Sequence, residues 1–278
     1  MTSTTVDTTH VVTFRQTLSN IGVLVRRNLL RIRRLPQLLV FATIQPVMFL
    51  LLFNYVFGGS IGQTLPPAAG GEYINWLIPG LLIQVAVFGA SSTAIGLSDD
   101  LQAGVIDRFR SLPMARSAVL AGRTIADLAR SAFVIGLMLV VGWLIGFRWQ
   151  TSFQETLLAF ALALLFAFAF SWVMATIGLA VKDPETAQTA SFLPLFPLVF
   201  ASSVFVPTET MPSWLQTFAD YQPVTILANA TRGLILGPGA LEPGQSTSQM
   251  IFLSFVWIAA ILVVFVPLAV RMYRKAIN

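Results

Sequence analysis

The chain has 278 residues, of which 56% are hydrophobic and 10% are charged, and its formal net charge is +5. Soluble domains are about 45–50% apolar and about 25% charged, so this chain carries too little charge to cover a water-exposed surface. Intrinsic disorder is excluded as well, because it combines low hydrophobicity with high net charge. The composition therefore indicates an integral membrane protein, whose basic excess belongs to cytoplasmic loops and not to a nucleic-acid-binding surface.

Cysteine is absent and histidine occurs once, as His10. Without cysteine the chain has no disulfide framework and no thiolate metal site. His10 lies in a Thr-rich start, and residues 1–12 are expected to form a disordered tail. We therefore expect the chain to bind no metal and no cofactor. No signal peptide is expected, because a long basic segment precedes the first apolar run and no small-residue cleavage pattern follows it.

Residues 13–35 carry apolar side chains at helical spacing, with arginines on the other faces. The apolar positions are Phe14, Leu18, Ile21, Val25, Leu29 and Ile32. This pattern predicts an amphipathic helix in the headgroup layer, whose arginines reach anionic lipid. A plain basic flank before the first span is the alternative, but it would need no such periodicity.

Residues 36–278 contain six apolar segments bounded by charged or turn-forming residues. A helix needs about 20 mostly apolar residues to cross a bilayer. The segments are 37–57, 76–98, 125–147, 156–181, 187–206 and 250–270. Arginine and lysine concentrate before the first span, in the second and fourth connections, and in the C-terminal tail. We therefore predict an all-α membrane protein with six transmembrane helices and both termini in the cytoplasm.

Charge is scarce inside these spans. Asp127 and Arg130 lie three residues apart near the cytoplasmic end of span 125–147, so we expect them to pair or to reach the membrane surface. An ion-coupled transporter usually carries ionisable residues deep in the membrane. A membrane enzyme needs clustered catalytic or metal-ligating groups, and the acidic cluster around Asp99 has no histidine beside it. Both classes are therefore disfavoured and stay as the alternatives.

The connection after span 76–98 has a helical pattern of its own. Its apolar positions share one face of a helix and are Leu101, Val105, Ile106, Phe109 and Leu112. Pro113 then ends the helix. A short helix with an aromatic side chain and exposed charge is typical of a segment that docks into a groove on another protein. A connector that lies on the membrane is equally compatible with the pattern.

The segment 207–249 is long for a loop between membrane spans. Trp214, Leu215, Phe218 and Tyr221 make it too apolar and aromatic for a free loop. Trp and Tyr favour the membrane interface. We therefore predict short helices that re-enter the outer interface and cover a pathway, since irregular backbone at that depth is tolerated only against protein or a wet cavity.

Weakly polar and aromatic helix faces are candidates for lining that pathway. The candidates are Gln45, Gln84, Phe88, Ser91, Gln188, Phe192, Leu195 and Ser202. Gln45 and Asn54 face opposite sides of one helix, so they cannot both line the same cavity. Ordinary hydrogen bonding between helices is the alternative role for each polar residue. Pro194 and Pro197 loosen span 187–206, as a static kink or as a bend used in gating.

These segments, in this order around six spans, resemble the permease subunit of a type-2 ABC exporter, in its daunorubicin/doxorubicin drug-resistance branch. The stretches that carry the resemblance are 104–113 with its continuation to Gly122-Arg123, 207–215, and 222–234. The family often has an acidic residue shortly before the loop glycine. Here Leu101-Gln102-Ala103 precedes Gly104, which leaves open which acid contacts a partner.

The resemblance implies a division of labour between chains. Two copies of a cytoplasmic ABC ATPase would bind ATP and Mg²⁺ and dock on this chain, and a second permease protomer, identical or related, would complete the pathway. The ATPase-coupling residues would be Asp100, Gly104, Asp107, Arg108, Phe109, Arg110, Pro113, Lys182, Asp183 and Glu185. The outer gate would include Pro207, Met211, Trp214, Pro223 and Arg232. The implied site of action is a bacterial cytoplasmic membrane, and the implied cargo is a hydrophobic drug or a lipid-like molecule.

The lysines support the need for a separate motor. A phosphate-binding P-loop requires Gly-Lys-Ser/Thr. The chain has two lysines, Lys182 after Val181 and Lys275 after Arg274, so neither can belong to a P-loop. We therefore expect no ATPase site in this chain, and the energy for transport has to come from another protein.

Overall fold

The computed structural model describes residues 36–62, 65–66, 72–104, 116–181, 183–242 and 244–277, and these residues contain helices and no strand. The tail 1–12 and the predicted amphipathic helix 13–35 lie outside the described residues. The long helices are α2 (Pro36–Leu52), α4 (Tyr73–Gln102), α6 (Arg116–Ile145), α7 (Phe153–Ala180), α8 (Pro184–Phe200) and α11 (Thr247–Ile277). The short ones are η1 (Phe53–Phe57), α3 (Gly58–Ile61), η4 (Thr208–Thr210), α9 (Ser213–Tyr221), α10 (Pro223–Leu236) and η5 (Pro238–Ala240).

Five helical segments are long and apolar enough to cross a membrane. They are Ala42–Ile61, Tyr73–Gln102, Gly122–Ile145, Phe153–Ala180 and Thr247–Lys275. Each coincides with one of the six predicted spans. The remaining prediction, 187–206, corresponds to α8, which has 17 residues and ends at Phe200. Helix length therefore supports five spans directly, and α8 is shorter than the roughly 20 residues that a full crossing needs.

Side chains after α8 explain why that helix stops. The amide Nε2 of Gln222 donates to the carbonyl oxygens of Leu198 and Ala201, at 2.9 and 3.3 Å. The hydroxyl of Ser202 donates to the carbonyl of Val199 at 2.5 Å and accepts from the backbone N–H of Val204 at 3.2 Å. These bonds satisfy the last carbonyl groups of α8, which would accept backbone N–H groups if the helix continued.

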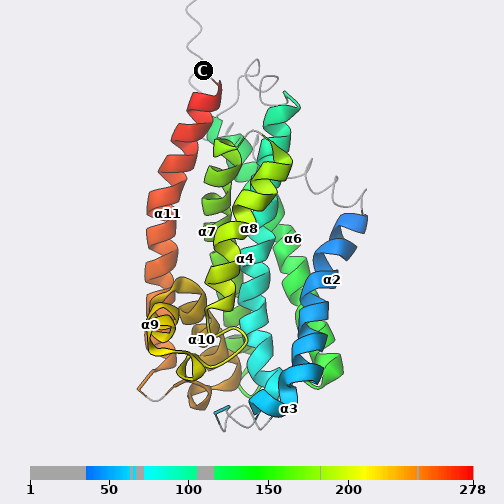
Figure 1. Cartoon of the computed structure of the whole chain (residues 1–278), viewed down its shortest axis with the longest axis vertical. Helices are drawn as coiled ribbons and strands as arrows, with labels where there is room; N and C mark the ends of the chain where they lie inside the picture. The colour runs from blue at the N-terminus through cyan, green and yellow to red at the C-terminus, as the bar shows by residue number, and fades with distance from the viewer. Residues whose placement is uncertain are drawn as a thin grey trace, which may run out of the picture.

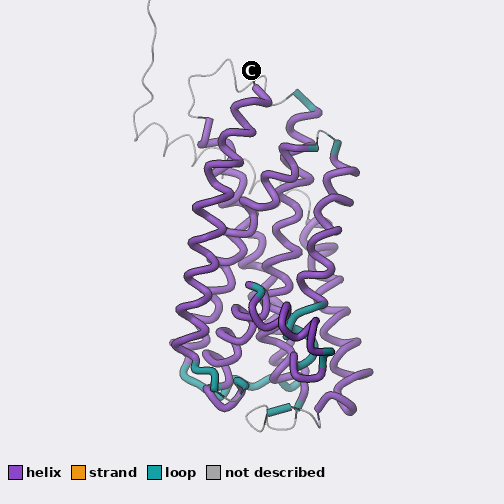
Figure 2. The backbone as a smooth tube through the Cα atoms, turned by 60° about the vertical axis from the view of Figure 1, so that its left-hand side comes forward, coloured by secondary structure: helices purple, strands orange, loops and turns teal. Residues whose placement is uncertain are grey.

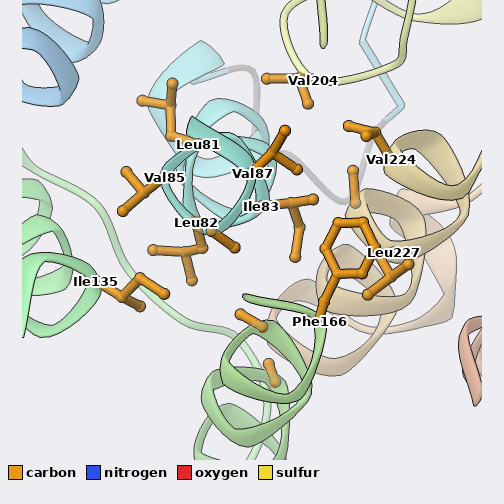
Figure 3. Close-up of a cluster of buried hydrophobic side chains, with 14 of the residues drawn as sticks. Leu81, Leu82, Ile83, Val85, Val87, Ile135, Phe166, Val204, Val224 and Leu227 are labelled. Carbon is orange, nitrogen blue, oxygen red and sulfur yellow. The ribbon is translucent and has the colours of Figure 1, made fainter. Parts of the chain in front are cut away.

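Helix α4 occupies the centre of the bundle. Figure 1 shows α7 and α8 beside it, with α11 on one flank and α2 on the other. In Figure 3 its side chains Leu81, Leu82, Ile83, Val85 and Val87 radiate toward the surrounding helices. The residues that meet them from those neighbours are Ile135, Phe166, Val204, Val224 and Leu227. A helix that is apolar on every face is buried on every face, as expected from its sequence.

Small residues let α7 approach α4 closely. Ala159, Ala163, Ala167 and Ser171 repeat every fourth position on α7, and all four are buried. At Gly178, a Cβ atom would lie 2.4 Å from the carbonyl oxygen of Ala94 on α4. Small side chains at such a seam bring backbones together and increase dispersion contacts. The α4–α7 pair therefore forms the rigid centre of the fold.

The two ends of the bundle differ. In Figures 1 and 2 the helices run roughly along the long axis, with the C-terminal end of α11 at one end of the molecule. Helices α3, α9 and α10 lie at the opposite end. Every residue of α10 is buried, and it packs against α4, α7 and α11. Within segment 207–249, which was predicted to cover a pathway, α10 is thus packed into that end of the bundle.

Candidate functional site

A cavity of about 160 Å³ lies between α2, α4, α6 and α8. Its lining consists of Ala42, Gln45, Pro46, Gln84, Val85, Phe88, Gly89, Ser91, Arg130, Ser131, Val134 and Phe192. The structure therefore brings together candidates from three different predicted spans. Asn54 does not line this cavity, in keeping with the opposite faces that Gln45 and Asn54 occupy. The transport role of these residues stays a prediction.

Gln84 is the most buried polar side chain of the cavity. It is 2% exposed, and its Oε1 has no hydrogen-bond partner among the described residues. An unsatisfied buried polar group costs about 1–3 kcal/mol. The neighbouring Ser91, by contrast, donates to the carbonyl of Phe88 at 2.7 Å. The cavity therefore contains one amide that a bound molecule or a water could satisfy.

The remaining pathway candidates lie elsewhere. Gln188 is exposed on the surface of α8. Leu195 is fully buried in the hydrophobic core. Ser202 closes the end of α8 through the two hydrogen bonds described above. None of these three lines the cavity, because α8 turns only the face around Phe192 toward it.

Asp127 and Arg130 turn to different partners on the neighbouring helix α4. Asp127 accepts hydrogen bonds from the hydroxyls of Ser92 and Thr93, at 3.2 and 2.7 Å. Arg130 instead donates from Nη2 to the carbonyl of Gly89 and to the hydroxyl of Ser92. The expected pairing of Asp127 with Arg130 is replaced by these bonds, because α4 offers polar groups within their reach. Arg130 consequently becomes part of the cavity wall, which sequence reasoning missed.

Arg123 forms ion pairs with Asp100 and Asp127. Its Nη1 lies 3.1 Å from Oδ2 of Asp100, and its Nε lies 3.7 Å from Oδ2 of Asp127. Nη1 also donates to the carbonyl of Gly96 at 3.0 Å. A Cβ atom on Gly96 would lie 1.4 Å from Nη2 of Arg123. The arginine can cross α4 only because position 96 is glycine, and it ties the end of α4 to α6.

The predicted coupling residues are only partly described. Asp100 is held by Arg123, and Gly104, with φ of 63°, ends the described part of α4's C-terminal turn. Asp183 caps α8, because its Oδ2 accepts from the backbone N–H and the hydroxyl of Thr186, both at 2.7 Å. These bonds lower the pKa of Asp183. Glu185 is exposed in the first turn of α8. The other predicted positions lie outside the described residues: Asp107, Arg108, Phe109, Arg110, Pro113 and Lys182.

A run of phenylalanine rings in mutual contact, some stacked and others tilted or edge-on, connects the cavity with the end of the bundle that holds α3. In order along the run they are Phe192, Phe88, Phe196, Phe200, Phe205, Phe53 and Phe57. Neighbouring ring centroids are between 4.2 and 6.0 Å apart. Sequence reasoning found only the first two. A sequence signal for other rings was present: the phenylalanines within α8 and within η1 are four residues apart, which places them on one helix face.

Arg232 holds together the end of the bundle that contains α10. Its Nε donates to the carbonyl of Trp76 at 3.2 Å, and Nη1 donates to Ser203 Oγ and Asn229 Oδ1, both at 2.8 Å. Nη2 donates to the carbonyls of Ser203 and Val204, at 2.5 and 3.3 Å. All five N–H donors of this guanidinium are therefore bonded. Arg232 was predicted as a gate residue, and the structure places it at 1% exposure between α4, α10 and the segment after α8.

The polar contacts continue from Arg232 toward a cleft at the surface. Asn229 donates to Gln245 at 3.3 Å, and Gln245 donates to Glu242 at 2.8 Å. The other carboxylate oxygen of Glu242 accepts from Thr208 at 2.7 Å. Burial raises the pKa of Glu242. Of these side chains, Asn229 and Glu242 border a cleft of about 390 Å³, which Pro207 and the Arg232 partners Trp76 and Ser203 also line.

The other predicted gate residues lie at different depths. Trp214 is 74% exposed on α9, and Met211 is partly buried just before that helix. Pro223 begins α10 and borders an apolar groove of about 520 Å³ between α7, α8, α9 and α11. Pro207 thus borders the cleft next to the Arg232 contacts, whereas Trp214 is exposed and Pro223 borders the apolar groove.

The chain is similar to known transporter proteins over most of its length. The ABC-2 type transporter family model matches residues 19–236. The chain is 32% identical over 249 residues to the daunorubicin resistance ABC transporter permease protein DrrB1 of Streptomyces coeruleorubidus, covering 90% of this chain and 84% of that protein. It is 27% identical over 236 residues to the probable doxorubicin resistance ABC transporter permease protein DrrC of Mycobacterium tuberculosis, covering 84% and 81%.

A third relative is more distant in sequence. The chain is 24% identical over 216 residues to the putative transport permease ycf38 of Cyanophora paradoxa, covering 76% of this chain and 72% of that one. These matches confirm the resemblance inferred from the sequence motifs. Because the family match spans most of an all-helical chain with several membrane-spanning helices, this multi-pass membrane protein belongs to the ABC-2 type transporter family and is a permease.

Proposed function

We propose that this permease is the membrane subunit of an ATP-driven exporter, which moves hydrophobic drugs or lipid-like molecules out across a bacterial cytoplasmic membrane. The observation that carries the proposal is the cavity between α2, α4, α6 and α8, with its weakly polar and aromatic lining. The relatives named for daunorubicin and doxorubicin resistance support a drug as cargo. The ion-coupled transporter and the membrane enzyme stay as the alternatives to be tested.

The route would run from this cavity along the phenylalanine run to the outer end of the bundle. The rings at positions 196 and 200 are 46% and 40% exposed, so their faces are open to a neighbouring molecule. Drug-sized ligands occupy pockets of roughly 300–1,000 Å³, and a cavity of about 160 Å³ is smaller than that. A second permease protomer would therefore complete the binding space, facing the apolar surfaces of α2 and α8.

In this arrangement α8 and the turns of segment 201–206 together make the sixth crossing. Helices α9 and α10 would re-enter the outer leaflet, and both termini would lie in the cytoplasm. The Arg232 contacts, with Pro207 beside them, would form the closed outer gate. The proposed position of α8 in the membrane is supported by its exposed apolar side chains, of which Leu193 is 78% exposed.

Two copies of a separate ATPase would drive the cycle, with ATP and Mg²⁺ bound to them. They would dock on the connection that follows Gly104 and on the turn before α8. The ion pair between Arg123 and Asp100 supports this assignment, because it joins the start of that connection to α6. Movement of the connection would thus reach the helix that carries Arg130.

The proposal is tested by co-expressing the permease with a candidate ABC ATPase from the same genome. Inverted membrane vesicles are expected to accumulate daunorubicin only when both chains and ATP are present. The matched control is an ATPase whose P-loop lysine is replaced by alanine, which should abolish accumulation while both proteins remain in the membrane. Accumulation that proceeds without ATP and stops when a protonophore collapses the proton gradient would support the ion-coupled alternative instead.

A further inference from the structure

The cavity between α2, α4, α6 and α8 offers hydrogen-bond acceptors to a bound molecule. Gln84 is 2% exposed, and its Oε1 is buried without a hydrogen-bond partner among the described residues. Pro46 lies inside α2 and has no N–H, so the carbonyl of Ala42 lacks the backbone donor that would bond it in a regular helix. All three residues line the cavity. The wall therefore fits a group that donates a hydrogen bond.

The donor that fits this wall is a neutral one. Arg130 lines the cavity and disfavours a cation at the same place. Its own charge is offset by a nearby carboxylate, because Nη2 donates to the hydroxyl of Ser92 and that hydroxyl donates to Asp127 at 3.2 Å. The cavity is thus neither a strong anion site nor a cation site. An O–H group can donate to its acceptors without carrying charge.

The volume and the aromatic wall match a single ring. The cavity measures about 160 Å³. A dry protein cavity of about 150 Å³ holds one benzene ring. Phe88 and Phe192 line the cavity, with their ring centroids 6.0 Å apart. Because aromatic rings pack well in tilted and edge-on contacts at such distances, these walls favour a flat ring over an alkyl chain.

We propose that the cavity binds one phenol ring of the cargo, whose O–H donates to Oε1 of Gln84 while the ring lies against Phe88 and Phe192. The inference rests on the proposed function, because it names the class of drug that the same cavity accepts, an aromatic molecule that bears a phenol. The remainder of the molecule extends along the phenylalanine run, outside the cavity. A cationic group on that remainder is therefore compatible with Arg130 in the cavity wall.

Gln84 is the residue that selects for the hydroxyl. A water that enters the cavity can bond the amide oxygen, and a phenol that displaces this water restores the same hydrogen bond. A ring without a donor displaces the water and leaves the buried oxygen unpaired. A site that hydrogen-bonds a hydroxyl rejects analogues that lack it for this reason. The cavity therefore distinguishes a phenol from an aromatic ring of equal size.

Equilibrium binding without ATP tests the inference, with the full-length permease in nanodiscs of phosphatidylcholine. The two tritium-labelled probes are para-pentylphenol and para-pentylfluorobenzene, in which fluorine replaces the hydroxyl and cannot donate. Binding to empty nanodiscs is subtracted, because both probes partition into lipid. Wild type is expected to bind the phenol about tenfold more tightly than the fluorinated probe. Equal affinities for the two probes would overturn the proposal.

Substitutions at position 84 assign the preference to this cavity. Gln84→Met removes the acceptor with a side chain of similar length, so the two probes should bind with equal affinity. It should also raise the thermal unfolding temperature, because a buried polar group without a partner is removed. Gln84→Glu keeps an oxygen acceptor and should keep the preference. Gln249→Met replaces an exposed glutamine on α11 and should change neither measurement. A phenol preference that survives in folded Gln84→Met would contradict the role of Gln84.

Ala42→Leu tests the location while Gln84 stays in place, and it serves also if Gln84→Met fails to fold. The larger side chain fills part of the cavity, so both probes should bind at least about tenfold more weakly. Unchanged binding in the folded variant would place the phenol elsewhere and overturn the assignment. Because no ATP is used, a phenol preference together with absent ATP-driven transport would count against the exporter proposal alone. Equal affinities together with intact transport would count against this inference alone.

Discussion

The guanidinium carbon of Arg232 lies 3.6 Å from the centroid of the Trp76 indole ring, at the end of the bundle that contains α10. A cation over an aromatic face is attracted to it, and the attraction grows when water is excluded. Arg232 also bonds the backbone oxygen of the same tryptophan and both carbonyls of Ser203-Val204. One side chain thus joins α10 to α4 and to the segment after α8, so these three parts have to move together.

Replacement of Arg232 by methionine is expected to destabilise the protein by roughly 2–4 kcal/mol, because it leaves buried acceptors on three segments without donors. Thermal unfolding of the purified protein in detergent measures this loss. Arg271→Gln is the matched control, since it removes an arginine that is exposed on α11. An Arg232→Met protein as stable as the control would show that these hydrogen bonds do not hold the α10 end of the bundle together.

Gly178→Ala is expected to separate α4 from α7. The new Cβ would lie 2.4 Å from the carbonyl oxygen of Ala94, and a backbone atom cannot move aside as a flexible side chain can. Overpacking of this kind costs about 1–3 kcal/mol. Gly136→Ala is the control, because nothing lies within 4 Å of a Cβ at that position of α6, and alanine favours a helix there by up to about 1 kcal/mol. Equal unfolding temperatures for the two variants would contradict the close seam.

Gly96→Ala is expected to displace Arg123 without unfolding the bundle. The added Cβ would occupy the position of the guanidinium, whose long side chain can swing away. Asp100 would then lose its ion pair with α6. We expect unchanged membrane insertion with reduced drug-stimulated ATP hydrolysis of the reconstituted complex. Hydrolysis as strongly stimulated as in wild type would show that the link between α4 and α6 is not used in coupling.

Glu242 is expected to make the stability of the α10 end of the bundle depend on pH. Burial raises its pKa above the ordinary value of 4.5, so the folded protein holds this proton more tightly than the unfolded chain. The resulting stabilisation is complete below about pH 4.5 and is lost as the pH rises through the folded-state pKa. Unfolding temperatures of wild type and Glu242→Gln, measured from pH 4 to pH 7, test this.

The glutamine variant should lose less stability than wild type as the pH rises, because it stays neutral and can still bond Thr208 and Gln245. Parallel pH profiles for the two proteins would show that Glu242 does not titrate in this window. Glu185→Gln, which replaces an exposed carboxylate in the first turn of α8, is the control for a general charge effect.

Much of the architecture could be predicted from local sequence. Charged residues bound the spans because a charge inside a bilayer is costly, so the five helices of spanning length coincide with predicted segments. The exception, α8, shows the limit of this reasoning. Its apolar run continues to Val206, but Gln222, which lies more than twenty residues further on, bonds its last carbonyls and ends the helix.

The site was predictable only in part for the same reason. Helical spacing placed Gln84, Phe88 and Ser91 on one face of α4, and this face does line the cavity. Spacing alone could not show that Arg130 turns to α4 and leaves Asp127 to Arg123. Nor could it show that Ser202 closes a helix end and that Arg232 satisfies all of its donors on three segments.

The sequence alone determined that this is a membrane protein, because so few of its residues are charged. The positions of those charges determined where most of the spans begin and end, and the neighbours of the two lysines showed that neither can serve a P-loop. Tertiary structure decided which faces meet, and so which few polar groups share a cavity and which single charge faces it. The physical reason is that hydropathy and helical period are local properties of the chain. The partners of a buried arginine or amide depend instead on which helices pack beside it.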